Sequence, residues 1–108
     1  MKIPHSAEAE DGIIGSCLID SYRCMDVCRK AGITPDKFYD GKRRLVFEVI
    51  LALHESGVSP DLLTVTDALH TRGALDNLGG AKAIDGFVDR TPTSANIEYY
   101  IDIFLKKY

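Results

Sequence analysis

The cysteines are the residues whose type and spacing come closest to a chemical site. Cys24 and Cys28 lie four residues apart, which places both on one face of a helix, and Cys17 can approach from a preceding helix. Structural zinc sites require four ligands in closely spaced pairs, and the three histidines are scattered along the chain. We therefore predict buried thiols that pack as small hydrophobic groups, with metal binding or redox chemistry as the alternatives.

Loops that bind the phosphates of ATP have a fixed spacing of glycines before Lys and Ser or Thr. In the one Gly-Lys pair, Gly41-Lys42, Asp36 stands where the loop requires glycine, and Arg43 replaces the residue that binds Mg²⁺. No nucleophile can be grouped with a histidine and an orienting third residue, and no pair of carboxylates stands out from the faces expected in solvent. We expect no catalytic residue, no metal site and no cofactor in this chain.

One window of the chain is strongly basic. Between Arg29 and Arg44 six basic residues oppose two acidic ones, whereas the whole chain has a net charge of −3. Lys42, Arg43 and Arg44 fall at the expected start of a helix, where positive charge is unfavourable and a phosphate or an acidic partner would relieve the cost. We take these three as a candidate basic patch; the alternative is a solvated face, or an Arg44 held by an internal hydrogen bond.

The last expected helix is apolar on two sides. Tyr99 and Ile103 lie four residues apart on a side that Lys106 extends. The other side has helical spacing and should face the core; it consists of Ile97, Tyr100, Ile101, Phe104, Leu105 and Tyr108. Such a helix either packs between elements of its own domain or offers one side to another chain. We therefore take Tyr99, Ile103 and Lys106 as a candidate protein interface.

The composition indicates one helical domain over residues 1–108. The chain is 45% hydrophobic and 27% charged, as in ordinary globular proteins, and its length fits a single domain. Charges interrupt every apolar run before the roughly 18 residues that a membrane span needs, and the acidic start is unlike a signal peptide. We therefore expect a cytoplasmic protein. Because strand alternation is absent, we expect an all-α globule of about six short helices.

Capping residues and glycines set the expected helix bounds. The helices run from about Ser6 to Ile19, Asp20 or Ser21 to Ala31, Gly41 to Ser56, Leu62 to Gly73, Gly80 to Asp89 and Ala95 to Lys107. The third is apolar almost all round and should be the buried centre of the fold. Thr64 and Asp67 have the spacing of a capping box. Close approach of another backbone would explain Gly12 and Gly15 inside the first helix.

Several short motifs follow one another along nearly the whole chain. They are Ile3-Pro4-His5-Ser6-x-Glu8-Ala9-Glu10 with Gly15, Phe38-Tyr39, Arg44-x-x-Phe47, Asp61-Leu62-Leu63-Thr64-Val65, Leu75-x-x-x-Gly79-Gly80 and Thr91-Pro92-Thr93-Ser94-Ala95-Asn96-Ile97-x-Tyr99-Tyr100. In this order they resemble the N-terminal domain of the bacterial or phage replicative DNA helicase family (DnaB-like). The sequence departs from the family at Lys82, where an aromatic residue is common, and in its three cysteines.

The resemblance implies a small helical module that precedes an ATPase, forms a collar on a hexameric ring and docks primase or, in some systems, a loader. We therefore expect a non-catalytic assembly and protein-interaction domain, whose partners are other helicase protomers, primase and a loader. ATP and Mg²⁺ would belong to the ATPase domain absent from this chain. The alternative is a small DNA-binding regulator of helix-turn-helix type that uses the basic window from Arg29 to Arg44. Salt dependence of DNA binding distinguishes the two hypotheses. A regulator that contacts several phosphates should bind DNA much more weakly as salt is added, whereas the helicase domain should bind DNA weakly or not at all.

The purified chain should hydrolyse no ATP and unwind no DNA, because none of its loops can hold a triphosphate. Phosphate release in the presence of ATP, Mg²⁺ and DNA should equal that of buffer. Turnover that follows the protein through successive columns, and is not traced to a contaminant, would contradict this prediction.

Overall fold

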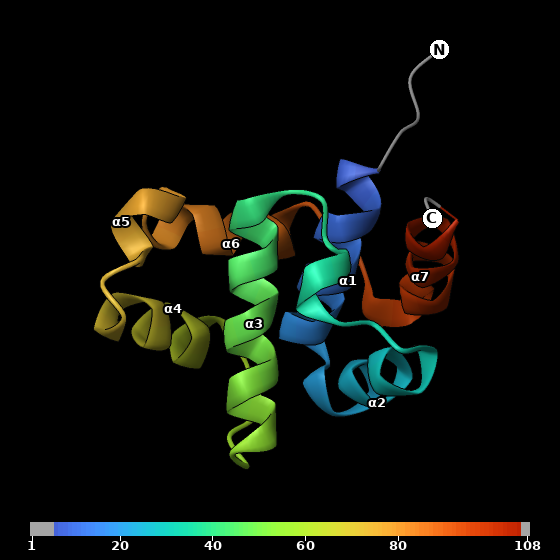
Figure 1. Cartoon of the computed structure of the whole chain (residues 1–108), viewed down its shortest axis with the longest axis horizontal. Coiled ribbons are helices and arrows are strands. Elements are labelled where there is room, and N and C mark those ends of the chain that lie inside the picture. Colours follow the sequence, from blue (N-terminus) through green and yellow to red (C-terminus); the bar gives the residue numbers. More distant parts are fainter. Residues whose placement is uncertain (1–5, 107–108) are drawn as a thin grey trace.

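The computed structural model describes residues 6–106, and within that range it contains α-helices and short 3-10 turns but no strand (Figure 1). The elements are α1 (Ala7–Ile19), α2 (Ser21–Ala31), η1 (Pro35–Lys37), α3 (Gly41–Glu55), α4 (Leu62–Thr71), α5 (Leu75–Leu78), α6 (Ala81–Asp89), η2 (Ser94–Asn96) and α7 (Ile97–Leu105). The all-α class and the bounds expected for the first three helices are confirmed. The predictions for Tyr108 and for an end at Lys107 lie outside the described residues.

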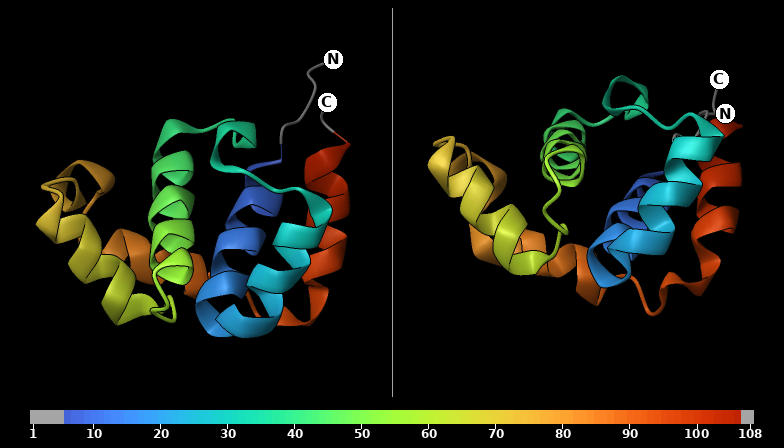
Figure 2. Two further views of the ribbon diagram at one scale, coloured as in Figure 1. Left: turned by 60° about the horizontal axis from the view of Figure 1, so that its bottom comes forward. Right: turned by 90° about the horizontal axis from the view of Figure 1, so that it is seen from below.

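Helix α1 is the hub of the fold. It packs against α2, α3, α6 and α7, while α4 packs against α3, α5 and α6. Figures 1 and 2 show α3 on one side of α1 and α7 on the other. No helix of the described range is long and apolar enough to cross a membrane.

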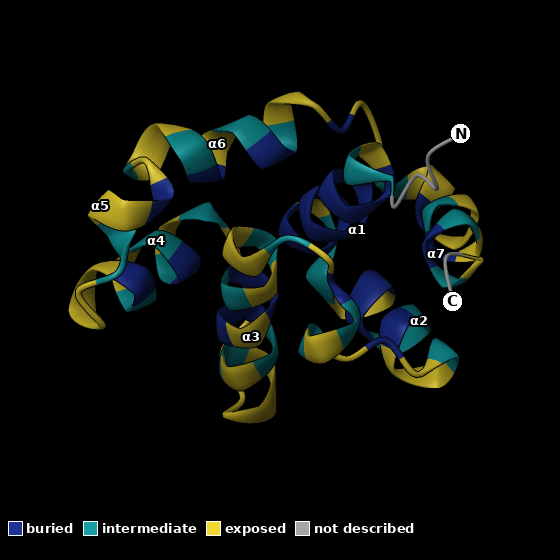
Figure 3. Ribbon diagram, turned by 45° about the horizontal axis from the view of Figure 1, so that its top comes forward, coloured by how far each residue is buried: buried dark blue, intermediate teal, exposed yellow. Residues whose placement is uncertain are grey.

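The buried centre of the fold is α1, and the prediction that the third helix occupies this place is wrong. Every residue from Ala9 to Leu18 is buried. In α3 the buried residues form one stripe, made of Val46, Phe47, Val49 and Ile50. Figure 3 shows the same contrast between the two helices. The apolar pattern favoured α3, but neighbouring elements approach a helix most closely at small side chains, and α1 has two glycines.

The glycines of α1 allow that close approach. A Cβ on Gly15 would lie 2.5 Å from the backbone oxygen of Phe87 and would also collide with the side chain of Thr91. A Cβ on Gly12 would lie 2.6 Å from the ring of Tyr100. The expected approach of a backbone is confirmed at Gly15, but it is wrong at Gly12, where the side-chain ring of Tyr100 approaches instead.

Side-chain caps explain where α1, α3 and α4 begin. The Ser6 hydroxyl accepts a hydrogen bond from the Ala9 amide at 2.9 Å, as the sequence predicts for a cap. In α4 the predicted capping pair is wrong by three residues: the box joins Asp61 and Thr64, at 2.8 and 2.9 Å. The helix begins at Leu62, so Thr64 is its third residue and not its cap. Helix α5 was not predicted, because its four residues are too few to show periodicity.

Replacing Gly15 by Ala should lower the free energy of unfolding by about 1–3 kcal/mol or more, because the core has no room for the methyl group. Gly41→Ala is the matched control: it also lies in a helix, nothing lies within 4 Å of its added Cβ, and it should raise stability by about 0.4–1 kcal/mol. Urea denaturation followed by circular dichroism measures both. Equal stability of the two variants would show that α1 is not tightly enclosed.

Candidate functional site

Two carboxylates of α1 lie inside the protein. Glu10 is 2% exposed and Asp11 is 8% exposed. The prediction that no carboxylate pair stands apart from the solvated faces is therefore wrong. The pair escaped sequence reasoning because its basic partners are distant in the chain: Arg43 is 32 residues from Asp11, and Arg90 is 79 residues from it.

Asp11 joins three helices through its two oxygens. Its Oδ1 accepts a hydrogen bond from Arg43 Nε at 2.7 Å, and its Oδ2 accepts one from Arg90 Nε at 3.0 Å. Burial, the largest single influence on the pKa of Arg43, lowers it, but the hydrogen bond to Asp11 and the charges of Asp11, Asp40 and Glu10 outweigh burial and raise the pKa. Arg43 is therefore a fixed cation at the start of α3.

Glu10 extends this cluster toward the loop before α3. Its Oε2 accepts the Tyr39 amide at 2.7 Å, which fixes the loop to α1. Its Oε1 lies 3.9 Å from Arg43 Nη1 and has no hydrogen-bond partner among residues 6–106. The cluster thus holds α1 against the N-terminal end of α3 by charge as well as by packing.

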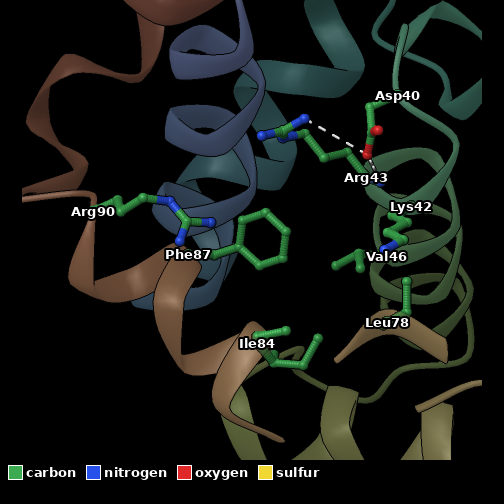
Figure 4. A pocket seen from close by; sticks show the side chains of 9 residues that line it. Asp40, Lys42, Arg43, Val46, Leu78, Ile84, Phe87 and Arg90 are labelled. Atoms are coloured by element: carbon green, nitrogen blue, oxygen red, sulfur yellow. Dashed lines mark hydrogen bonds and ion pairs between the residues drawn. The ribbon is translucent and has the colours of Figure 1, made fainter. Parts of the chain in front are cut away.

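A cavity of about 280 Å³ lies beside this cluster, between the start of α3 and helix α6 (Figure 4). Its apolar lining consists of Val46, Leu78, Ala83, Ile84 and Phe87. Its polar lining consists of Asp40, Lys42, Arg43 and Arg90. We call this cavity the α3–α6 pocket. It combines an apolar floor with a few charged groups at its rim, as binding pockets in proteins usually do.

The three residues of the candidate basic patch are not equivalent. Lys42 and Arg43 line the α3–α6 pocket, whereas Arg44 donates a hydrogen bond to the Phe38 carbonyl at 3.0 Å. Arg43 faces inward to Asp11, and its Nη1 also lies 3.6 Å from Asp40. Among residues 6–106, Lys42 is the one residue of these three whose side chain forms neither a hydrogen bond nor an ion pair.

Two other cations of the basic window form ion pairs. Arg29 and Lys30 both pair with Asp26, at 2.9 and 3.1 Å. A continuous basic face, which a helix-turn-helix regulator would need, is therefore not favoured by this arrangement.

The candidate interface on α7 is partly exposed. Tyr99 is 65% exposed, and Lys106 pairs with Asp102 at 3.2 Å on the surface. Ile103 is half-buried and packs against the core. The structure therefore brings Tyr99 and Lys106 to solvent, while Ile103 lies at the margin between core and surface.

Comparison with known proteins decides the family. Residues 2–106 match the DnaB-like helicase N terminal domain. The chain belongs to this family. The resemblance expected from its motifs is confirmed.

Relatives of this DnaB-like domain include the replicative DNA helicases DnaB of Leifsonia xyli (35% identical, 96% of this chain) and Treponema pallidum (30%, 93%). This chain spans 22% of the length of each. The crystal structure of the N-terminal domain of DnaB helicase from Mycobacterium tuberculosis superimposes with a TM-score of 0.88 at 31% identity. That match covers 98% of this chain and 74% of the other.

The cysteines of this DnaB-like domain lie in the core between α1 and α2, as buried thiols should. The Sγ atoms of Cys17 and Cys28 are 3.8 Å apart. That contact and burial raise the pKa of Cys17, and burial raises the pKa of Cys24 to about 11. In the described part of the chain, no group of His, Cys, Asp and Glu residues is placed to hold a metal ion.

The Asp11 ion pairs should contribute unequally to stability. Asp11→Asn should lower the free energy of unfolding by about 1–3 kcal/mol, because it removes the buried negative charge and replaces one of the two accepting oxygens by an NH2 group that faces a guanidinium. Double-mutant cycles with Arg43→Met and Arg90→Met should give the larger coupling energy for Arg43, whose side chain is 21% exposed against 52% for Arg90. Asp26→Asn, which removes only exposed ion pairs, is the control. Equal effects of Asp11→Asn and Asp26→Asn would contradict this assignment.

The buried Cys24 thiol should make stability fall at high pH. Its pKa is about 11 in the folded protein against 9.0 for an ordinary thiol, so between these values the folded protein keeps a proton that the unfolded chain releases. The free energy of unfolding from urea titrations should therefore fall as pH rises through this range, and less steeply in Cys24→Ala. Parallel curves for the two proteins would exclude the thiol as a cause.

Proposed function

We propose that this chain is a non-catalytic assembly and protein-interaction domain of a hexameric replicative DNA helicase. It would form the N-terminal collar of the ring and dock primase or a loader in the cytoplasm during DNA replication. The observation that carries this proposal is the match of nearly the whole chain, in sequence and in fold, to the N-terminal domain of DnaB helicases. ATP and Mg²⁺ would bind to the ATPase part of the parent protein, because this sequence contains no phosphate-binding loop.

The outer side of α7 supports the assembly role. Tyr99 has a large exposed ring, and the half-buried Ile103 adds apolar surface on the same side. The charged Lys106 lies at the C-terminal end of this side. Exposed apolar surface aligned along one helix is typical of a protein interface. We place the contact with a second helicase protomer on this side of α7.

Tyr99→Ala combined with Ile103→Ala should weaken self-association of the chain, measured by sedimentation equilibrium, without unfolding it. We expect a monomer–dimer equilibrium that is weak in the wild type, because interfaces below about 1,200 Å² are usually transient. Tyr22→Ala is the matched control, since Tyr22 is 88% exposed on α2 and lies outside the proposed contact. The double variant should retain the wild-type helical spectrum. Loss of the exposed Tyr99 ring should shift stability by about 0.5 kcal/mol, and truncation of the half-buried Ile103 should cost less than the about 2–5 kcal/mol of a fully buried site.

Two results would separate an interface from a core. If the double variant unfolds while the wild type stays monomeric at high concentration, the side chains belong to the core and the assembly surface lies elsewhere.

Docking of primase is tested separately, by isothermal titration of the chain with the primase encoded in the same genome. Absence of heat with primase, together with a strictly monomeric wild type, would overturn the proposed function.

A further inference from the structure

The α3–α6 pocket has two cationic side chains with nitrogens available at its rim. Arg90 is held by its Nε on Asp11, and its guanidinium carbon lies 5.1 Å from the centroid of the Phe87 ring. Its two terminal nitrogens have no acceptor among residues 6–106. Because Asp11 and the ring fix the guanidinium, Arg90 would lose little conformational entropy on binding an anion.

Lys42 is the second cation. It is exposed, lines the pocket and forms no ion pair within the described part of the chain. It is the second residue of α3, where the helix dipole disfavours positive charge and favours a nearby anion. The acidic groups close by are already engaged: Asp40 accepts the Arg43 amide at 2.9 Å, and Asp11 holds both arginines.

The floor of the pocket selects for an apolar group. Val46, Ile84 and Phe87 are buried by their own packing and present carbon surface to the cavity (Figure 4). A volume of about 280 Å³ accommodates one large side chain but falls below the usual size of cofactor sites. Arg90 lies over the ring of Phe87, so that face of the ring is not free for stacking with a nucleobase.

We propose that the α3–α6 pocket binds an acidic peptide segment of a partner protein, with an apolar side chain in the cavity and a neighbouring carboxylate on Lys42 and Arg90. The inference rests on the proposed docking function and deepens it, because it names the surface and the chemistry of the partner. The carboxylate would pair with Lys42, which forms no ion pair among residues 6–106, and with the terminal nitrogens of Arg90, which its Nε contact to Asp11 leaves without an acceptor. The apolar side chain would pack against the apolar lining of the cavity.

The test uses a fluorescein-labelled peptide, Gly-Ser-Asp-Glu-Phe-Leu-Glu-Asp-Ser-Gly, titrated with the whole chain and followed by fluorescence anisotropy. Lys42→Glu should weaken binding about tenfold, because it reverses a charge at the rim. Lys82→Glu is the matched control: it makes the same charge change at the second residue of α6, outside the pocket lining, and should weaken binding less than about twofold. Ala83→Phe, which fills the cavity from α6, should abolish binding, and circular dichroism verifies that each variant is folded.

Altered peptides separate the two parts of the recognition. Replacing Phe and Leu by Ser, or the acidic residues by Asn and Gln, should each abolish binding, and added salt should weaken it. No binding at about 1 mM chain, or equal effects of Lys42→Glu and Lys82→Glu, would overturn the proposal. Displacement of the peptide by single-stranded DNA, dependent on Lys42, would assign the pocket to nucleic acid instead. Each of these failures would leave the self-association and primase measurements unaffected, so it would reject the pocket and not the proposed function.

Discussion

The buried Asp11 carboxylate is the interaction on which the arrangement of the helices depends. It lies on the most enclosed helix of the fold, and its two oxygens are satisfied by guanidinium groups from the start of α3 and the end of α6. A carboxylate removed from water without partners is strongly destabilising, so α3 and α6 must lie where Arg43 and Arg90 can reach it. Packing of apolar stripes alone would leave the rotation and the register of these helices less sharply defined.

The turn that follows Arg90 explains why α1 needs a glycine at position 15. Thr91 follows Arg90, and its hydroxyl donates to the Phe87 carbonyl at 2.8 Å while the side chain fills the space above Gly15. The chain can therefore turn tightly after α6 only where α1 has no side chain. Charge fixes the turn through Arg90, and the absence of a Cβ on Gly15 lets the turn approach.

The sequence predicted the features that depend on neighbouring residues. Ser6 as a cap and the glycine after α2 set the helix ends, because caps act over three or four residues. The identity of the buried helix could not be predicted from apolar content, because it depends on side-chain volume and on which surfaces face α1. The ion pairs of Asp11 were equally hidden, since their partners lie far away in the chain. On α7 the pattern predicted a second apolar side, on which Tyr99 is indeed exposed, but it could not show that Ile103 is half covered by the domain itself.

Helix α1 lies between the elements that carry the two proposed binding surfaces. Helix α3, which contributes to the pocket lining, lies on one side of α1, and α7, which carries Tyr99, lies on the other (Figures 1 and 2). A second copy on α7 would therefore leave the pocket open. Arg43 and Arg90 belong both to the core cluster and to the pocket lining, so the shape of the pocket is set by the same charges that orient the helices. A rim fixed in this way needs little reorganisation on binding, which favours specific docking by a small surface.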